Sequence, residues 1–340
     1  MYYKELYSKK ENGNLPQLVV AADENMQSRY VVQRILQLRE EGVPLDEMAI
    51  LFRSSYLSFD LEIELAKANI PFVKYGGFKF IETAHVKDMI AYLRVLENPR
   101  DVVSWNRILL LIDGVGPRTS EKIIDDILQN RIGSHSPGRE ALVSTKFWTG
   151  FHGFPQGVQK LFDVLKEAAS QAMPPAEKTY HVLQYYEPIL RARYDDYNKR
   201  LKDLEMFQNI TERYEDITAL LTDLALEPPT ESVVDVEDPG KETERLVLST
   251  IHSAKGLEWH SVFLIYALEG RFPTMRAVAN DDEMEEERRL MYVACASAKE
   301  NLAIAYQINI FDRESGMILS KPSRFVQGIA ENLLEPWVVE

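Results

Sequence analysis

The sequence predicts an α/β fold in which a parallel sheet is interrupted by a mostly helical insertion. Six short apolar stretches have the length and composition of buried strands, at 17–22, 48–52, 72–75, 245–250, 261–266 and 302–306. Helical patterns over 28–41 and 59–68 separate the first three stretches by short links. Strands and helices that alternate in this way are typical of a parallel sheet. We therefore expect all six strands to lie in one sheet.

The middle of the chain has helical periodicity and almost no strand signal, from about Thr83 to Leu226. Its clearest part is 186–224, where apolar side chains recur in steps of three and four, as in amphipathic helices packed on one face. The acidic stretch 231–244 then predicts a linker or loop. We expect a discontinuous lobe and an inserted helical domain, with the boundaries 15–86 and 242–330 for the lobe and 87–241 for the insertion.

Composition and charge limit the class of protein. The 340 residues contain one cysteine, Cys295, so no internal disulfide can form, and we expect a reducing, cytoplasmic location. No apolar run approaches the roughly 18 residues of a membrane helix, so no membrane partner is expected. The net charge of −14 argues against a general nucleic-acid coat but is compatible with local DNA contacts.

The strongest motif, at 248–259, has polar and basic groups just after a strand. The strand ends at Thr250, and His252, Lys255 and Glu258 follow it, with Gly256 allowing a tight turn. Parallel sheets bind ligands at the carboxyl ends of their strands, and hydroxyl, imidazole and ammonium groups can all contact phosphate. By itself the motif predicts either an anion-binding corner or an ordinary turn with a surface lysine.

A second motif, at 285–300, begins with three glutamates and has Lys299 near its end. Acidic residues at the start of a helix and a lysine near its end both suit the helix dipole. Taken alone, this segment is a capped amphipathic helix.

Together, the two motifs resemble motifs V and VI of the UvrD-like superfamily 1 DNA helicases. The first has the family's pattern Thr-x-His-x-Ala-Lys-Gly-Leu-Glu, and the second has Glu-Glu-Glu-Arg-Arg-Leu followed by Tyr-Val-Ala. Further segments resemble the family in the same order along nearly the whole chain: 49–54, 70–77, 80–82, 87–88, 92–93 and 322–325. The resemblance implies that the lobe is the second of two RecA-like motor lobes.

In this family, ATP and Mg²⁺ bind in a cleft between the two lobes, and single-stranded DNA runs across both. The first lobe supplies the phosphate-binding loop. This sequence contains no Gly-x-x-x-x-Gly-Lys-Ser/Thr, and its nearest glycine cluster, 114–117, lacks the Lys-Ser/Thr pair. We expect the first lobe to lie outside this sequence and to be a required partner. ATP and Mg²⁺ are expected to bind only together with it, with no metal bound by this chain alone.

The resemblance also implies roles for individual residues. Those expected to contact the DNA backbone or to shape the loop beside it are Thr250, His252 and Lys255. Those expected at the nucleotide are Glu258 near the ribose, Gly256, and Arg53 at the cleft between the lobes. For Arg53, a surface ion pair is the alternative.

Segment 111–124 resembles a helix-hairpin-helix turn. Gly114 and Gly116 would let backbone N–H groups face a phosphate, with Arg118 and Lys122 nearby. Such a turn contacts duplex DNA without reading its sequence, so we expect a duplex junction as a further partner. The alternative is a plain glycine-rich turn between two helices.

The second motif departs from the family pattern at its end. The family continues Val-Ala-x-Thr-Arg-Ala, whereas this chain has Ala296 and Ser297 in place of the threonine and the arginine. The resemblance makes Ser297 the position of a catalytic arginine finger, which neutralises charge on the transferred phosphoryl group. Serine has no charge and a short reach. Lys299, two positions on, would face another side of the expected helix.

Two functions therefore stay open from the sequence. The first is the C-terminal part of an ATP-dependent DNA helicase or translocase, for which the family implies movement from 3′ to 5′. The second is a degenerate, non-hydrolysing module that binds DNA or a partner protein, which the loss of the arginine favours. In both cases we expect the chain alone to be inactive as an ATPase.

Overall fold

A computed structural model describes residues 13–77, 79–132, 142, 145–148, 153–169, 173–226, 244–312 and 316–339. The chain forms two compact units, one made of 1–78 with 227–340 and the other of 79–226. The discontinuous unit holds the sheet, and the continuous unit is helical. The linker predicted at 231–244 lies outside the described residues, except for Glu244.

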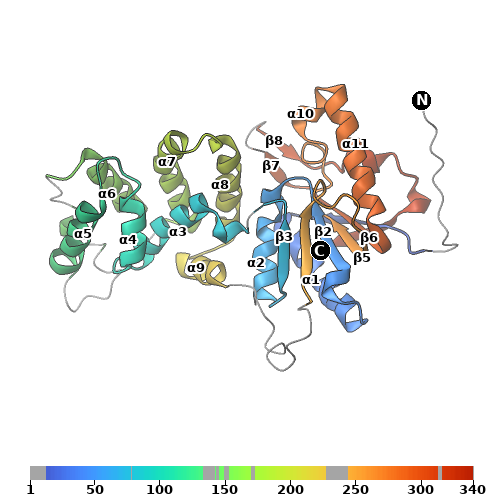
Figure 1. Ribbon diagram of the computed structural model, residues 1–340, viewed down its shortest axis with the longest axis horizontal. Helices are drawn as coiled ribbons and strands as arrows, with labels where there is room; N and C mark the ends of the chain where they lie inside the picture. Colours follow the sequence, from blue (N-terminus) through green and yellow to red (C-terminus); the bar gives the residue numbers. More distant parts are fainter. Residues whose placement is uncertain are drawn as a thin grey trace. The chain divides into compact units, whose positions relative to one another are not determined.

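The discontinuous unit contains a seven-stranded sheet in the order β3-β4-β2-β5-β6-β1-β9 (Figure 1). All neighbouring strands in it are parallel. The strands are β1 (Gln17–Ala21), β2 (Met48–Phe52), β3 (Phe72–Tyr75), β4 (Leu246–Thr250), β5 (Trp259–Leu264), β6 (Ala298–Gln307) and β9 (Glu335–Val339). The prediction that six strands from both ends of the chain share one parallel sheet is confirmed.

The α-helices described in this unit are α1 (Glu24–Glu40), α2 (Phe59–Lys67), α10 (Met275–Val278), α11 (Asp281–Ala296) and α12 (Arg324–Gln327). Local capping explains where the two longest begin. Before α1, Asp23 accepts a hydrogen bond from the backbone N–H of Met26 at 2.8 Å. Before α11, Asn280 accepts from the N–H groups of Asp282 and Glu283. Such side-chain oxygens satisfy N–H groups that the start of a helix leaves free.

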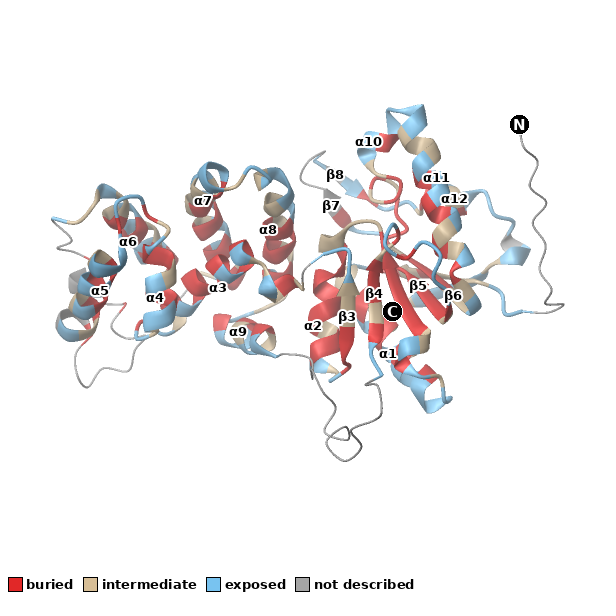
Figure 2. Cartoon of the chain, viewed as in Figure 1, coloured by how far each residue is buried: buried red, intermediate tan, exposed pale blue. Residues whose placement is uncertain are grey.

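Helices cover both faces of the sheet. α1 and α2 pack against each other, and Leu38 of α1 lines a cavity together with Phe263 of β5. On the other side, Leu290 of α11 packs in a core with Val262. Because successive strand residues point to opposite faces, α1 and α11 lie on opposite sides of β5. Figure 2 shows the central strands between them as buried.

The end of α11 differs from the prediction. A helix was expected to continue to Lys299, but α11 ends at Ala296 and Lys299 lies in β6. The reason is a contact that is distant in sequence: the N–H of Trp259 donates to Ser297 O at 2.8 Å, and Trp259 pairs with Ala298. Pairing with β5 therefore overrides the helical tendency of this alanine-rich segment.

Three strands were not predicted. β9 extends the sheet beyond β1. β7 (Ile310–Asp312) and β8 (Met317–Leu319) form a separate antiparallel pair.

The continuous unit is helical throughout its described residues, which confirms the predicted insertion. Its α-helices are α3 (Ala84–Glu97), α4 (Val102–Leu109), α5 (Pro117–Asp126), α6 (Gln156–Ala168), α7 (Pro175–Arg193), α8 (Tyr197–Thr211) and α9 (Ile217–Ala225). Asp88 links three of them, because it accepts hydrogen bonds at 2.6 Å from both Arg107 Nε and Tyr186 Oη. The unit begins before the expected residue 87, since α3 starts at Ala84 and packs on α4, α7, α8 and α9.

Short helical turns complete both units, at Leu45–Glu47, Ser55–Ser58, Phe80–Glu82, Ile127–Arg131, Thr145–Trp148 and Glu331–Leu333. Among the described helices, none has the length and apolar character needed to cross a membrane.

Candidate nucleic-acid interface

Two neighbouring strand ends bring the first group of predicted residues together. β2 and β4 are paired, with Phe52 opposite Thr250. The N–H of Ile251 donates to Phe52 O at 3.0 Å, so the pairing continues past the strand ends. Arg53 and His252 therefore emerge near each other at the carboxyl edge of the sheet, where the charge of Arg53 acts on the His252 ring.

A tight turn after β4 shapes this edge. Thr250 Oγ1 donates to Ser253 Oγ at 3.0 Å, and the N–H of Ser253 lies 3.0 Å from Thr250 O. The turn leaves His252 and Lys255 exposed. Gly256 has a φ of +87°, a left-handed conformation that favours glycine. The turn thus presents a hydroxyl, an imidazole and an ammonium group, each able to contact phosphate.

Arg53 is held by a buried carboxylate. Its Nε and Nη2 atoms both lie 2.8 Å from Oε1 of Glu287, in α11. Glu287 is only 2% exposed, and its Oε2 has no hydrogen-bond partner. A buried carboxylate is costly without a cation, and Arg53 supplies that cation.

Glu287 was not predicted as a member of the site. A signal existed, because Glu287 stands three and seven positions before Leu290 and Ala294, which lie on the buried face of α11. A carboxylate on the apolar face of a helix predicts a partner there. Which cation it would meet could not be read from the sequence.

The electrostatic surroundings of His252 favour the neutral ring. Desolvation is the main cause that lowers the pKa of His252 below its ordinary 6.5, and the positive charge of Arg53 adds to it. Glu286 and Glu287 act in the opposite direction. The imidazole is therefore mostly uncharged near pH 7 unless a bound anion stabilises its protonated form.

A second group of predicted residues lies at the amino edge of the sheet. Glu258 directly precedes β5 and is exposed, and Ser297 directly precedes β6. Ser297 is 3% exposed, and its Oγ donates to Val293 O at 2.9 Å. The hydroxyl of Ser297 is thus directed back into its own helix.

The predicted site residues therefore lie at two opposite edges of the sheet. Parallel strands run in one direction, so Arg53, which follows β2, and Glu258, which precedes β5, lie at opposite ends of a paired set of strands. The structure brings Arg53 close to Thr250 and His252 rather than to Glu258, and its expected contact with the nucleotide stays a prediction.

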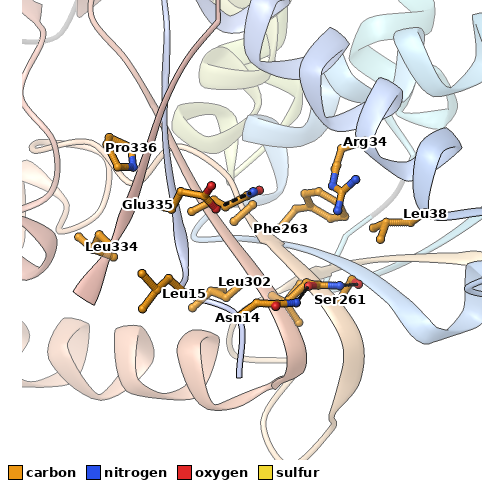
Figure 3. A pocket seen from close by; sticks show the side chains of 14 residues that line it. Asn14, Leu15, Arg34, Leu38, Ser261, Phe263, Leu302, Leu334, Glu335 and Pro336 are labelled. Atoms are coloured by element: carbon orange, nitrogen blue, oxygen red, sulfur yellow. Dashed lines mark hydrogen bonds between the residues drawn. The ribbon is translucent and has the colours of Figure 1, made fainter. Parts of the chain in front are cut away.

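A cavity of about 560 Å³ also opens near the amino edge, on the side of α1 (Figure 3). Its polar groups bond to one another: Asn14 Nδ2 donates to Asn301 Oδ1 at 2.9 Å, Asn301 Nδ2 to Ser261 Oγ at 3.1 Å, and Gln17 Nε2 to Glu335 Oε2 at 3.2 Å. No predicted site residue lines this cavity, so it contributes to neither group.

The helical unit carries the remaining predicted residues. α4 and α5 are joined by a turn in which Gly114 has a φ of +80°, and Gly116 caps α5 without a side chain. Gly114, Gly116, Arg118 and Lys122 are all exposed. Exposed N–H groups at the start of α5, with two cations beside them, are suited to bind a phosphate. The structure thus places these four residues at one exposed turn, and their contact with duplex DNA stays a prediction.

No metal site emerges from the part of the chain that the structure describes. Within it, no group of three or more His, Cys, Asp or Glu side chains is placed to hold an ion.

Comparison with known proteins identifies the family. The sequence pattern of the UvrD-like helicase C-terminal domain matches residues 2–309. The ATP-dependent DNA helicase PcrA of Staphylococcus epidermidis is 33% identical over 350 residues, which cover 98% of this chain and 46% of that helicase. PcrA of Staphylococcus aureus is 33% identical over 351 residues, with the same coverage. The chain thus spans about half the length of the curated relatives it matches, and it belongs to the family of UvrD-like helicase C-terminal domains.

Proposed function

We propose that this chain is the part of an ATP-dependent DNA helicase or translocase that holds single-stranded DNA and forms one wall of the ATP cleft. The observation that carries the proposal is the grouping of Arg53, Thr250 and His252 at one edge of the sheet. Contacts to phosphate hold a strand without reading its sequence, as movement along DNA requires. Membership in a helicase family supports the same function.

ATP is the substrate of the proposed activity, and this chain offers only part of its site. The exposed carboxylate of Glu258 is suited to accept hydrogen bonds from ribose hydroxyls. Phosphate binding, Mg²⁺ binding and most of the rate acceleration require a phosphate loop, which this sequence lacks. The first motor lobe is therefore the partner that we infer for this chain.

A second candidate is a module that binds DNA or a partner protein without hydrolysing ATP. The burial and bonding of Ser297 favour this second candidate, because a buried serine bonded to Val293 O cannot neutralise phosphoryl charge. An arginine finger is worth about 10³–10⁵ in rate in well-studied nucleotide hydrolases.

Steady-state ATPase of the complete protein, first lobe included, separates the two candidates. With saturating single-stranded DNA, the helicase function predicts measurable ATP turnover by the protein with Ser297 and faster turnover after Ser297→Arg. Turnover that is absent before and after this substitution favours the second candidate.

The turn at Gly114 extends the proposal to duplex DNA. Backbone N–H groups there, with Arg118 and Lys122, are suited to the phosphates of a duplex at the junction where strands separate. For the direction of movement we infer 3′ to 5′, on the resemblance alone.

The proposed DNA contact is tested by fluorescence anisotropy with a labelled single-stranded oligonucleotide. We expect weak binding with a shallow salt slope, because few phosphates are contacted and each one on a single strand contributes about −0.7 to that slope. His252→Ala should weaken binding. His181→Ala, which removes a partly exposed histidine of α7, is the matched control. Equal affinity of wild type and His252→Ala would remove His252 from the DNA path.

A further inference from the structure

The end of β3 lies beside both strand ends that carry the proposed DNA contacts. β3 pairs with β4 (Figure 2), with Tyr75 opposite Ser249, and β4 pairs with β2. The β3 terminus, defined here as Lys74–Gly77, therefore reaches the same carboxyl edge as Thr250.

Gly76 lies directly on the turn after β4. A Cβ atom added at Gly76 would stand 2.3 Å from Thr250 Oγ1 and 2.9 Å from Ser253 Oγ, and its φ is +81°. Only a residue without a side chain fits this approach and this conformation. The bare backbone of Gly76 thus packs against the hydroxyl pair of Thr250 and Ser253.

Gly77 makes the equivalent approach to the segment after β2. A Cβ atom at Gly77 would stand 2.1 Å from Ser55 Oγ and 2.8 Å from Ser55 Cβ. Ser55 is two positions after Arg53. Two consecutive glycines therefore contact the two segments that carry the proposed phosphate contacts.

Lys74 holds the segment after β2 from the interior of the unit. Its side chain is 1% exposed, and Nζ donates to Ser55 O at 3.1 Å and to Glu62 Oε1 at 2.7 Å. The ammonium also lies 4.8 Å from the ring centre of Phe59. Burying an ammonium is costly unless it is paired, and the pair with Glu62 offsets that cost. The bond to Ser55 O ties the backbone beyond β2 to β3.

We propose that the β3 terminus is the positioning element of the DNA-binding edge, holding the Arg53 segment and the Thr250 turn in fixed register for the phosphodiester backbone of single-stranded DNA. This inference rests on the proposed function and adds the element that preorganises its site. Preorganised contacts bind better because less ordering remains to be done on binding.

Gly77→Ala tests the steric part of the proposal. It should weaken single-stranded DNA binding roughly tenfold, the worth of one charge-assisted hydrogen bond. Adding Ser55→Gly, which removes the atoms that the new methyl group would meet, should restore most of the affinity. Gly328→Ala is the control, because a Cβ atom there meets nothing within 4 Å and its φ is −89°.

Lys74→Met tests the polar part, and a double variant separates positioning from stability. Lys74→Met removes the ammonium that pairs with the buried Glu62, so it should lower both thermal stability and DNA affinity. Adding Glu62→Gln removes that buried charge and should recover stability, while Ser55 O still lacks its donor and affinity stays low. Lys67→Met, which breaks a surface pair with Glu64, is the matched control.

Cys295 reports whether each variant is folded during the titration. Burial raises the pKa of Cys295 to about 11, so its thiol reacts slowly with alkylating reagents while the lobe is intact. Affinities are compared only at temperatures where labelling of Cys295 is as slow as in wild type.

The outcomes distinguish the positioning role from the DNA-binding function itself. Weak affinity in folded Gly77→Ala and in folded Lys74→Met/Glu62→Gln supports the proposal. The positioning proposal is overturned if DNA affinity returns together with stability in Lys74→Met/Glu62→Gln and if Gly77→Ala binds DNA with full affinity. The proposed function still stands in that case, provided that His252→Ala weakens DNA binding. Absence of binding by wild type overturns both.

Discussion

Arg53 and Glu287, 234 residues apart, form an ion pair in which two guanidinium nitrogens lie 2.8 Å from one carboxylate oxygen. The pair joins the carboxyl edge of the sheet to α11. The same helix ends at Ala296, and its C-cap residue Ser297 lies at the amino edge, ten residues and about 15 Å further along the axis from Glu287. One rigid element therefore connects the proposed DNA contact to the proposed wall of the ATP cleft.

Glu287→Gln should strengthen binding of single-stranded DNA. The substitution keeps the size of the side chain but removes the charge that competes with phosphate for Arg53. A partly exposed ion pair is worth up to about 1 kcal/mol, so the expected gain is at most roughly fivefold. Anisotropy titration measures it, with Glu286→Gln as the control because Glu286 is an exposed neighbour paired with Arg289. Weaker binding by Glu287→Gln would mean that the pair is needed to orient Arg53.

Arg53→Gln should lower the free energy of unfolding as well as DNA affinity. Glu287 stays buried but loses its cation, and removing one partner of a buried ion pair costs about 3–5 kcal/mol. Urea unfolding measures the loss. The double variant Arg53→Gln/Glu287→Gln should regain stability without regaining DNA affinity. If the single variant is as stable as wild type, the ion pair contributes nothing to folding.

The contribution of His252 to DNA binding should grow as the pH falls. Desolvation and Arg53 lower the pKa of His252 below 6.5 in the free protein, so at pH 7.5 the ring is neutral. A phosphate favours the charged ring, and lowering the pH to about 5.5 supplies the proton. Other groups also gain protons, so the quantity to compare is the ratio of wild-type to His252→Asn affinity at each pH. A ratio that does not change with pH contradicts a phosphate contact by the imidazole.

The purified 340-residue chain should show no DNA-stimulated ATP hydrolysis. Charge neutralisation and positioning by a phosphate loop and Mg²⁺ supply most of the catalysis in phosphoryl transfer, and the sequence has no such loop. A coupled ATPase assay against a vector control checks this. Turnover above that control would require a phosphate site elsewhere in the chain.

The fold was largely predictable because its strands are short apolar stretches with clear boundaries. β2, for example, is buried at all five positions and stands out as an uninterrupted apolar run. β9 was missed because 335–339 is mostly exposed and begins Glu-Pro, which gives neither an apolar run nor alternation. The end of α11 was wrong because pairing of Trp259 with Ala298 decides it, and pairing between distant segments overrides local propensity.

The positions of site residues were predictable only where these residues lie within one continuous sequence motif. Thr250 and His252 follow a strand within one continuous motif, so their place at a strand end could be inferred. The partner of Arg53 lies 234 residues away; the place of Glu287 on the buried face of α11 indicates that it has a partner but not which cation that is. Lys74 looks like an ordinary strand lysine until its contacts with Ser55 O and Glu62 are known.

Photo-crosslinking tests the central claim, that the carboxyl edge of this lobe holds single-stranded DNA, most directly. An oligonucleotide carrying a photoreactive base would be irradiated with the chain, and the crosslinked peptides identified by mass spectrometry. Crosslinks should fall on 53–55, 74–77 and 250–256 and should disappear with excess unlabelled strand. Crosslinks confined to the amino edge, at 258–261 and 297–301, would contradict the account.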